Sequence, residues 1–226
     1  MIDSNEILER LRREPQTEFT LKQALKEMGI MVPKGLLLNE PPESIDIHFP
    51  VALKVSDEKV LHKTELGGVK IGIESIGVLR NEINEMKKKF PGSSFLVEEM
   101  IQGGLEIIVG LSRNPEFGLS IMLGMGGTLT EIYNDVTFRL IPVQAQDCND
   151  MIDEVSIGRF TGNGFRGKFI ERKILIDFLL KISELGSKES DFIEQLDLNP
   201  VKMDGGKLFV LDAKMIKSIT EKEGIQ

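Results

Sequence analysis

The segment that most constrains the fold is residues 51–73, with the sequence VALKVSDEKVLHKTELGGVKIGI. An apolar run ending in Lys54 predicts a buried strand, and a polar loop with His62 follows it. The pair Gly67 and Gly68 then leads into a second strand that alternates apolar and polar residues. Lysine supplies a point charge for phosphate oxygens, glycines let backbone N–H groups approach an anion, and an imidazole can act as a covalent nucleophile. The pattern indicates a site that handles a phosphoryl group.

The composition is that of an ordinary globular protein. The 226 residues can bury a full core and divide into two lobes. A net charge of −8 argues against a general nucleic-acid or anionic-membrane surface. The single cysteine, Cys148, excludes an intrachain disulfide framework and fits a reducing compartment. No apolar run approaches the roughly 18 residues of a membrane span. We therefore expect a cytoplasmic protein with neither nucleic acid nor membrane as a partner.

Local patterns predict an α/β chain of helices and short strands. Capping residues followed by apolar positions at helical spacing mark helices near residues 3–11, 20–28, 75–90, 147–158 and 170–185. Apolar runs bounded by turn residues mark strands near 35–39, 49–55, 69–73, 95–99, 105–112, 118–123, 128–133, 136–143, 194–199 and 207–212. The last two strands flank a Met-Asp-Gly-Gly turn, which predicts a hairpin.

Four stretches in a fixed order carry a resemblance to a known family. They are LHKTELGGV (61–69), FLVEEMIQGGLEIIVGLSRNPEFG (95–118), GMGGTLTEIYNDVTFRLIPV (124–143) and LDLNPVKMDGGKLFVLDAKM (196–215). Together they resemble the ATP-grasp, or β-type, subunit of the ADP-forming acyl-CoA synthetases (acetate–CoA ligases), which are relatives of succinyl-CoA synthetase. The resemblance implies an ATP-grasp fold of class α/β (α+β), in which nucleotide is held between two lobes. We expect residues 1–18 to be an N-terminal appendage, 19–95 the small lobe and 96–226 the large lobe.

The resemblance implies specific roles for the loop residues of the first motif. His62 would be phosphorylated within the ATP site and exchange its phosphoryl group with the nucleotide. Taken alone, His62 could be an ordinary loop histidine and Lys54 a strand-end lysine that reaches water. Their setting beside Gly67 and Gly68 favours a nucleophile and a phosphate ligand instead. A phosphoryl carrier must move, so we expect the loop from about residue 56 to 65 to be mobile or partly exposed without nucleotide.

A second group of predicted nucleotide contacts lies around the segment EEMIQGGLE. ATP-grasp enzymes generally place one carboxylate before a hinge, near the adenine amine, and a second one strand later, on the ribose hydroxyls. The resemblance puts Glu99 and Glu106 in these positions, with the backbone of Met100 and Ile101 at the adenine edge. Carboxylates only accept hydrogen bonds, and both the amine and the hydroxyls can donate them. The alternative is a pair of outward-facing glutamates on antiparallel strands.

Asn199 and Asp212 are the predicted magnesium ligands. Magnesium prefers oxygen ligands and usually takes one or two protein groups together with nucleotide phosphates. The two residues end successive strands of the predicted hairpin, and Asp197 shares the face of Asn199 as a third candidate. The alternative is that they only cap strand ends. Arg139 is a further candidate, for contact with phosphate or with a partner subunit.

The resemblance further implies that the chain is half of an enzyme. The family also needs a CoA-binding Rossmann region and a second active-site histidine, and this chain has no GxGxxG unit after a strand. We therefore expect an α-type partner, in an α2β2 assembly, with ATP or ADP and Mg2+ as cofactors. The complex would interconvert acyl-CoA, ADP and phosphate with carboxylic acid, CoA and ATP. The alternatives are a stand-alone ATP-grasp carboxylate ligase and a non-catalytic nucleotide-binding subunit.

Overall fold

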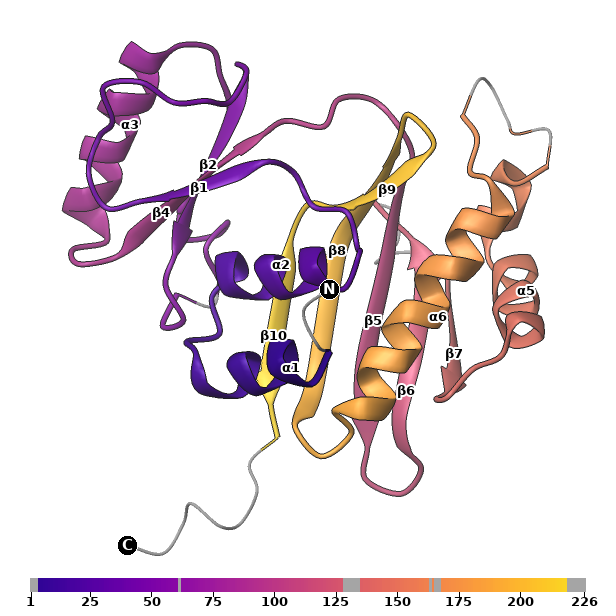
Figure 1. The fold of residues 1–226 in the computed structure, drawn as a ribbon. Helices are drawn as coiled ribbons and strands as arrows, with labels where there is room; N and C mark the ends of the chain where they lie inside the picture. Colours follow the sequence, from indigo (N-terminus) through magenta and orange to yellow (C-terminus); the bar gives the residue numbers. More distant parts are fainter. Residues whose placement is uncertain (1–3, 61, 128–134, 163, 165–167, 219–226) are drawn as a thin grey trace, which may run out of the picture.

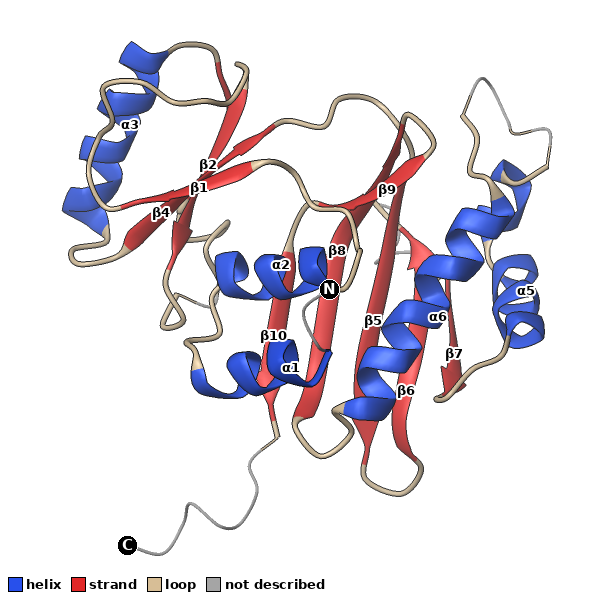
Figure 2. Cartoon of the chain, in the orientation of Figure 1, coloured by secondary structure: helices blue, strands red, loops and turns tan. Residues whose placement is uncertain are grey.

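The protein is built on two antiparallel β-sheets, each with helices packed against it (Figures 1 and 2). The computed structural model describes residues 4–60, 62–127, 135–162, 164 and 168–218. The strand predicted near residues 128–133 lies outside this range. The other predicted strands are present within one to a few residues of their expected positions, and the α/β class with two lobes is confirmed.

The smaller sheet has four strands in the order β1-β4-β2-β3. Its strands are β1 (Gly35–Leu38), β2 (Val51–Ser56), β3 (Val69–Ile73) and β4 (Ser94–Glu99). Helix α3 (Ile76–Lys89) packs against this sheet through Leu79, Ile83 and Met86, as its apolar spacing predicts. The predicted cap is confirmed, because the Ser75 hydroxyl accepts a hydrogen bond from the Val78 N–H. A separate apolar core therefore forms in this lobe.

The larger sheet has six strands, ordered β10-β8-β5-β6-β7 with β9 paired to β8. Its strands are β5 (Glu106–Asn114), β6 (Gly118–Met125), β7 (Val136–Leu140), β8 (Ile193–Asp204), β9 (Lys207–Val210) and β10 (Ala213–Lys217). Helices α1 (Ser4–Arg13), α2 (Glu18–Glu27) and α6 (Arg172–Lys188) lie on one side of it, and α5 (Ala145–Glu154) lies near β7 (Figure 1). The short η1 (Ser156–Phe160) follows α5 and contacts β6.

The apolar cores divide the chain differently from the predicted lobe boundaries. Ile7 and Leu11 of α1, with Leu21 and Leu25 of α2, are buried in the core of the larger lobe. Helix α1 therefore packs into the larger lobe, and the apolar face of α2 is buried there as well, while Glu18 and Lys22 of α2 reach the smaller sheet. The reason is that both helices carry an apolar stripe, and the larger sheet offers the surface that buries it.

Helix α2 begins three residues earlier than the sequence pattern predicts. Thr17, not Thr20, is the N-cap, and its hydroxyl accepts a hydrogen bond from the Thr20 N–H at 3.2 Å. This start places Glu18 and Lys22 one helical turn apart on the buried face of the helix. The early start of α2 thus delivers two charged groups to the junction between the lobes.

The C-terminal hairpin is also more extended than predicted. Strand β8 pairs with β9 through residues 201–204 and with β10 through its first half, so it spans both neighbours. Asp212 therefore lies in the break between β9 and β10. Asn199 is still beside it, because the Asn199 N–H donates to the Asp212 carbonyl at 3.3 Å. The predicted adjacency of the two residues is confirmed, although a different strand pairing produces it.

Candidate functional site

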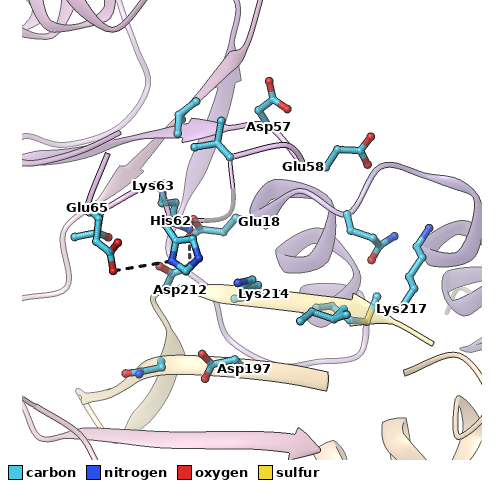
Figure 3. A pocket seen from close by; sticks show the side chains of 18 residues that line it. Glu18, Asp57, Glu58, His62, Lys63, Glu65, Asp197, Asp212, Lys214 and Lys217 are labelled. Carbon is cyan, nitrogen blue, oxygen red and sulfur yellow. Dashed lines mark hydrogen bonds and ion pairs between the residues drawn. The ribbon is translucent and has the colours of Figure 1, made fainter. Parts of the chain in front are cut away.

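A cleft opens between the loop that follows β2 and the strands β8 and β10. Its volume is about 690 Å3. Figure 3 shows His62 and Lys63 of the loop above it, Asp212 and Lys214 on the β10 side, and Asp197 on β8. The cleft thus brings together the predicted nucleophile and all three predicted magnesium ligands, which come from segments far apart in the sequence: His62, Asp197, Asn199 and Asp212.

The loop is closed by its own backbone hydrogen bonds. The Gly67 N–H donates to the Thr64 carbonyl at 3.0 Å, and the Gly68 N–H donates to the Lys63 carbonyl at 2.6 Å. Gly67 has a φ of 66°, in the left-handed region that favours glycine. A Cβ on Gly68 would lie 2.6 Å from the Cγ1 atom of Val55. Both glycines therefore shape the loop, and their N–H groups are engaged within it.

His62 points into solvent at the edge of this cleft. Its side chain is 68% exposed, and its Nδ1 atom lies 4.0 Å from a carboxylate oxygen of Glu65. The loop from residue 56 to 65 is partly exposed at its described positions, as expected for a segment that carries a reactive group outward. The imidazole is therefore accessible to a phosphoryl donor or acceptor.

Lys54 occupies a different environment from the one predicted for a phosphate ligand. Its side chain is 9% exposed. The ammonium group donates to Glu18 at 2.6 Å and to the Leu211 carbonyl at 2.5 Å, and it lies 3.0 Å from a Glu98 oxygen. A lysine has three N–H donors, so these three partners use its full capacity. Lys54 is thus a member of a buried ion-pair network in the described structure, and it does not line the cleft.

Lys22 completes this network between the lobes. It lies 2.7 Å from Glu18, 2.7 Å from Glu98 and 2.7 Å from the Leu211 carbonyl. We name Glu18, Lys22, Lys54 and Glu98 the interlobe network. Its members come from α2, which packs in the larger lobe, and from β2 and β4 of the smaller sheet. Buried charges are tolerated here because each one meets an opposite charge and further hydrogen-bond partners.

Burial and neighbouring charges shift the pKa values of Glu18, Lys54 and Lys22. Burial alone would raise the pKa of Glu18, but the ammonium groups of Lys54, Lys22 and Lys63 outweigh it and hold that pKa well below its ordinary value. Burial opposes the charge on Lys54 as well, but the carboxylates of Glu18 and Glu98 raise its pKa. For Lys22, burial has the largest effect and lowers the pKa. The charged state of Glu18 is therefore strongly favoured.

Lys63 connects the loop to this network and to the cleft. Its ammonium group pairs with the second carboxylate oxygen of Glu18 and donates to Asp212 Oδ1 at 2.7 Å. No sequence pattern assigned a role to Lys63, and none singled out Glu18, Lys22 or Glu98. One signal was available, because Glu18 and Lys22 fall at the i and i+4 positions of the stripe that contains Leu21 and Leu25.

The residues predicted to bind magnesium offer suitable oxygen donors. In the register of β8 and β10, Asp197 lies opposite Lys214. The Asp197 side chain lines the same cleft as Asp212. Burial raises the pKa of Asp197, and the nearby charge of Asp212 raises it further. A cation would relieve this repulsion, and carboxylate and amide oxygens are ligands that hard divalent ions prefer. Within the described residues no group of three His, Cys, Asp or Glu side chains is placed to hold a metal by itself.

The predicted adenine and ribose contacts lie at the connection between the sheets. Glu99 ends β4, and its carboxylate accepts a hydrogen bond from the Lys34 N–H at 2.8 Å. The Met100 sulfur accepts from the Gly72 N–H, and Ile101 follows in the connecting segment 100–105. Glu106 begins β5 and lies 3.3 Å from the Lys202 ammonium. These four residues flank the junction between the lobes but do not line the cleft that contains His62.

Arg139 lies apart from both groups. Its guanidinium pairs with Glu154 at the end of α5, and it lines a separate groove of about 500 Å3 on strands β5 to β7. The structure therefore gives Arg139 a local ion pair and does not bring it to His62.

No described helix is long and apolar enough to span a membrane.

Comparison with known proteins identifies close relatives over almost the whole chain. The model of the ATP-grasp domain family matches residues 8–216. The β subunit of ADP-forming acetate–CoA ligase II from Pyrococcus furiosus is 34% identical over 217 residues, which cover 90% of this chain and 92% of that protein. The ADP-forming acetate–CoA ligase I of Archaeoglobus fulgidus is 37% identical over 179 residues, which cover 75% of this chain and only 26% of that protein.

Solved structures give the same result. An acetyl-coenzyme A synthetase 1 chain from Ca. Korarchaeum cryptofilum, in complex with coenzyme A and Ca-AMPCP, superposes with a TM-score of 0.83 and 32% identity, covering 96% of this chain and 100% of that one. Two further structures of that synthetase are described with a phosphorylated phosphohistidine segment in a site I orientation, and with the segment pointing towards the nucleotide-binding site. The predicted ATP-grasp fold is confirmed.

Proposed function

Because this chain belongs to the ATP-grasp β subunits of the ADP-forming acyl-CoA synthetases, we propose that it transfers a phosphoryl group between His62 and ADP. The complete synthetase would interconvert acyl-CoA, ADP and phosphate with carboxylic acid, CoA and ATP. The observation that carries the proposal is the exposed imidazole of His62 at the edge of a cleft whose other wall holds Asp197, Asn199 and Asp212.

His62 acts as the covalent carrier. In the direction of ATP synthesis, the bond between phosphorus and the imidazole nitrogen breaks as a terminal oxygen of ADP bonds to phosphorus, and the electron pair returns to the ring. The exposed position of His62 on a loop lets the same imidazole meet a second phosphoryl site on the partner. The carboxylate of Glu65, 4.0 Å from the His62 Nδ1 atom, belongs to the same loop.

The nucleotide is held between the lobes. Glu99 would accept from the adenine amine and Glu106 from the ribose hydroxyls, with the backbone of Met100 and Ile101 at the adenine edge. Their support is that all four flank the connection between the two sheets. Glu99 already accepts a hydrogen bond from the Lys34 N–H and Glu106 is ion-paired with Lys202, so nucleotide binding uses the remaining acceptor capacity of these groups.

Asn199, Asp212 and Asp197 would hold Mg2+ together with the nucleotide phosphates. A bound magnesium ion supplies charge neutralisation on the transferring phosphoryl group. The chain's own residues would orient that group, because the oxygen donors come from β8 and from Asp212 just before the adjacent β10, and they line the cleft below the loop. Lys54, which the sequence suggested as a phosphate ligand, donates a hydrogen bond to Glu18, and Glu18 lines the cleft.

We also propose an α-type CoA-binding partner, an α2β2 assembly and a cytoplasmic location. The support for a partner is that the Pyrococcus relative is a β subunit of nearly the same length. In the Archaeoglobus relative the matching part is about a quarter of a longer protein, which is consistent with a partner region fused to it.

The phosphoenzyme provides the test of this proposal. The chain has two histidines, so His48→Asn is a matched control for His62→Asn. After incubation with labelled ATP and Mg2+, we expect an acid-labile, base-stable label on the wild type and on His48→Asn, and none on His62→Asn. Calorimetry should show that His62→Asn binds nucleotide as tightly as the wild type. Nucleotide binding without any label on the wild type would overturn the proposal and favour a direct carboxylate ligase or a non-catalytic subunit.

A further inference from the structure

Neighbouring residues of the loop, His62 and Lys63, have opposite environments. The His62 side chain is 68% exposed, whereas the Lys63 side chain is 15% exposed. Lys63 turns from the loop toward the body of the protein, where it pairs with Glu18 and with Asp212 (Figure 3). One residue thus presents its group to solvent while the next residue attaches the loop to both sides of the cleft.

We propose that Lys63 is a positioning residue that latches the His62 loop in place, and that a cation arriving at Asp212 releases it. The inference rests on the proposed function in one respect, since it takes Asp212 as a cation ligand. Holding of the loop by Lys63 is independent of that assignment.

Val60 packs against the core of the smaller lobe, and few polar side chains attach this loop to the rest of the protein. Of the described residues 57–66, Asp57 and Lys63 make the hydrogen bonds or ion pairs that reach beyond the loop. The Asp57 contact is with Ser93, at 2.6 Å, and it lies at the start of the loop next to β2. The contacts of Lys63 are therefore the polar attachment nearest to His62, and their loss would free the reactive part of the loop.

The chemistry of Asp212 makes the latch sensitive to a cation. The Lys63 ammonium lies 2.7 Å from Asp212 Oδ1, so it occupies the coordination space that a metal ion would need at that oxygen. An ammonium and a divalent cation on one carboxylate repel each other strongly at such distances. Cation binding at Asp212 is therefore expected to displace Lys63.

Release of Lys63 leaves the other partner stable. Glu18 remains paired with Lys54 at 2.6 Å and with Lys22 at 2.7 Å, so its buried charge stays compensated. The interlobe network can thus lose Lys63 without leaving an isolated carboxylate, and the two lobes stay joined while the loop departs. After Lys63 leaves, Glu18 keeps two ammonium partners, and Asp212 exchanges the Lys63 ammonium for the cation.

Limited proteolysis measures the latch directly. A glutamate-specific protease can cut after Glu58 and Glu65, and these sites are unchanged in Lys63→Gln. Because cleavage of a closed loop follows the population of its open form, we expect Lys63→Gln to be cut about tenfold faster than the wild type without metal. Lys59→Gln removes an exposed lysine of the same loop and should be cut at the wild-type rate. Lys63→Arg should restore slow cleavage, and the unfolding midpoint should stay near that of the wild type.

The response to metal tests the release. Titration with Mg2+ at constant ionic strength should accelerate cleavage of the wild type and leave Lys63→Gln unaffected. Equal cleavage of the wild type and Lys63→Gln without metal would overturn the latch. A wild-type loop that ignores Mg2+, in a protein where Lys63→Gln is open, would overturn release by the cation.

The labelling experiment separates this inference from the proposed function. If Lys63→Gln opens the loop but His62 is never labelled by ATP, the proposed phosphoryl transfer fails and the holding role of Lys63 stands. If His62 is labelled and the Lys63→Gln loop remains as protected as the wild type, the latch fails alone.

Discussion

Two charged regions meet at the cleft, and they differ in how they are held. The interlobe network of Glu18, Lys22, Lys54 and Glu98 is buried, and its members lie on a helix and two strands. The loop that carries His62 is polar too, but most of its described side chains are exposed. Similar residue types therefore join the two lobes in one place and lie mostly in solvent in the other.

Whether a charged side chain can leave its partner depends on the backbone element that carries it. Lys54 and Lys63 both pair with Glu18. Lys54 sits on β2, between β3 and β4, so it cannot leave without disrupting the sheet. Lys63 sits on a loop that closes on its own glycines, so it can depart together with His62. Motion in this subunit is expected to be concentrated in the loop, with the lobes held together by the interlobe network.

The largest loss of unfolding free energy is expected when the buried interlobe network is disrupted. Glu18→Gln removes the carboxylate shared by Lys22, Lys54 and Lys63, and leaves buried ammonium groups without their main partner. Removal of one member of a buried ion-pair network costs about 3–5 kcal/mol of unfolding free energy. Urea denaturation would measure it.

The matched control is Glu9→Gln, which removes an exposed carboxylate paired with Arg13 on α1. Exposed i,i+4 pairs contribute about 0.3–0.5 kcal/mol, so this variant should be nearly as stable as the wild type. Equal losses in the two variants would show that burial does not distinguish the interlobe network from surface pairs.

An intermediate loss of unfolding free energy is expected at acidic pH. The pKa of Glu18 in the folded protein lies below its ordinary value of 4.5, so its contribution to stability is present above that pH and is lost as the pH falls through the folded value. Each such carboxylate contributes a slope of about 1.4 kcal/mol per pH unit in this acid range. The unfolding free energy of the wild type should therefore fall below about pH 4.5, and Glu18→Gln should reduce this slope. Glu58→Gln, in the exposed loop, should leave it unchanged.

The smallest effect is expected at Arg139. Its ion pair with Glu154 lies at the surface, so Arg139→Gln should cost less than about 1 kcal/mol of unfolding free energy. Because Arg139 is paired with Glu154 and lines a separate groove on β5 to β7, calorimetry should also show an unchanged affinity for Mg-ADP. A clear loss of affinity would place Arg139 in the nucleotide site, as the sequence first suggested.

Much of the fold could be predicted because it depends on local patterns. Ser75 and the apolar spacing after it predict α3, and the alternation of residues 69–73 predicts β3. The boundaries of the lobes could not be predicted in this way. The apolar stripes of α1 and α2 require burial, but they do not specify which of the two sheets provides it.

The sequence by itself determined the family, the loop that carries His62, and the adjacency of Asn199 and Asp212, because these depend on short motifs and their order along the chain. Only the tertiary structure decided the roles of the lysines. Lys54 and Lys63 are nine residues apart, and the sequence suggested a phosphate ligand only at Lys54. Their environments depend on Glu18 and on Asp212, which lies about 150 residues further along the chain from Lys63. Electrostatic interactions act through space at distances of a few ångströms, so a one-dimensional pattern cannot show which charge meets which.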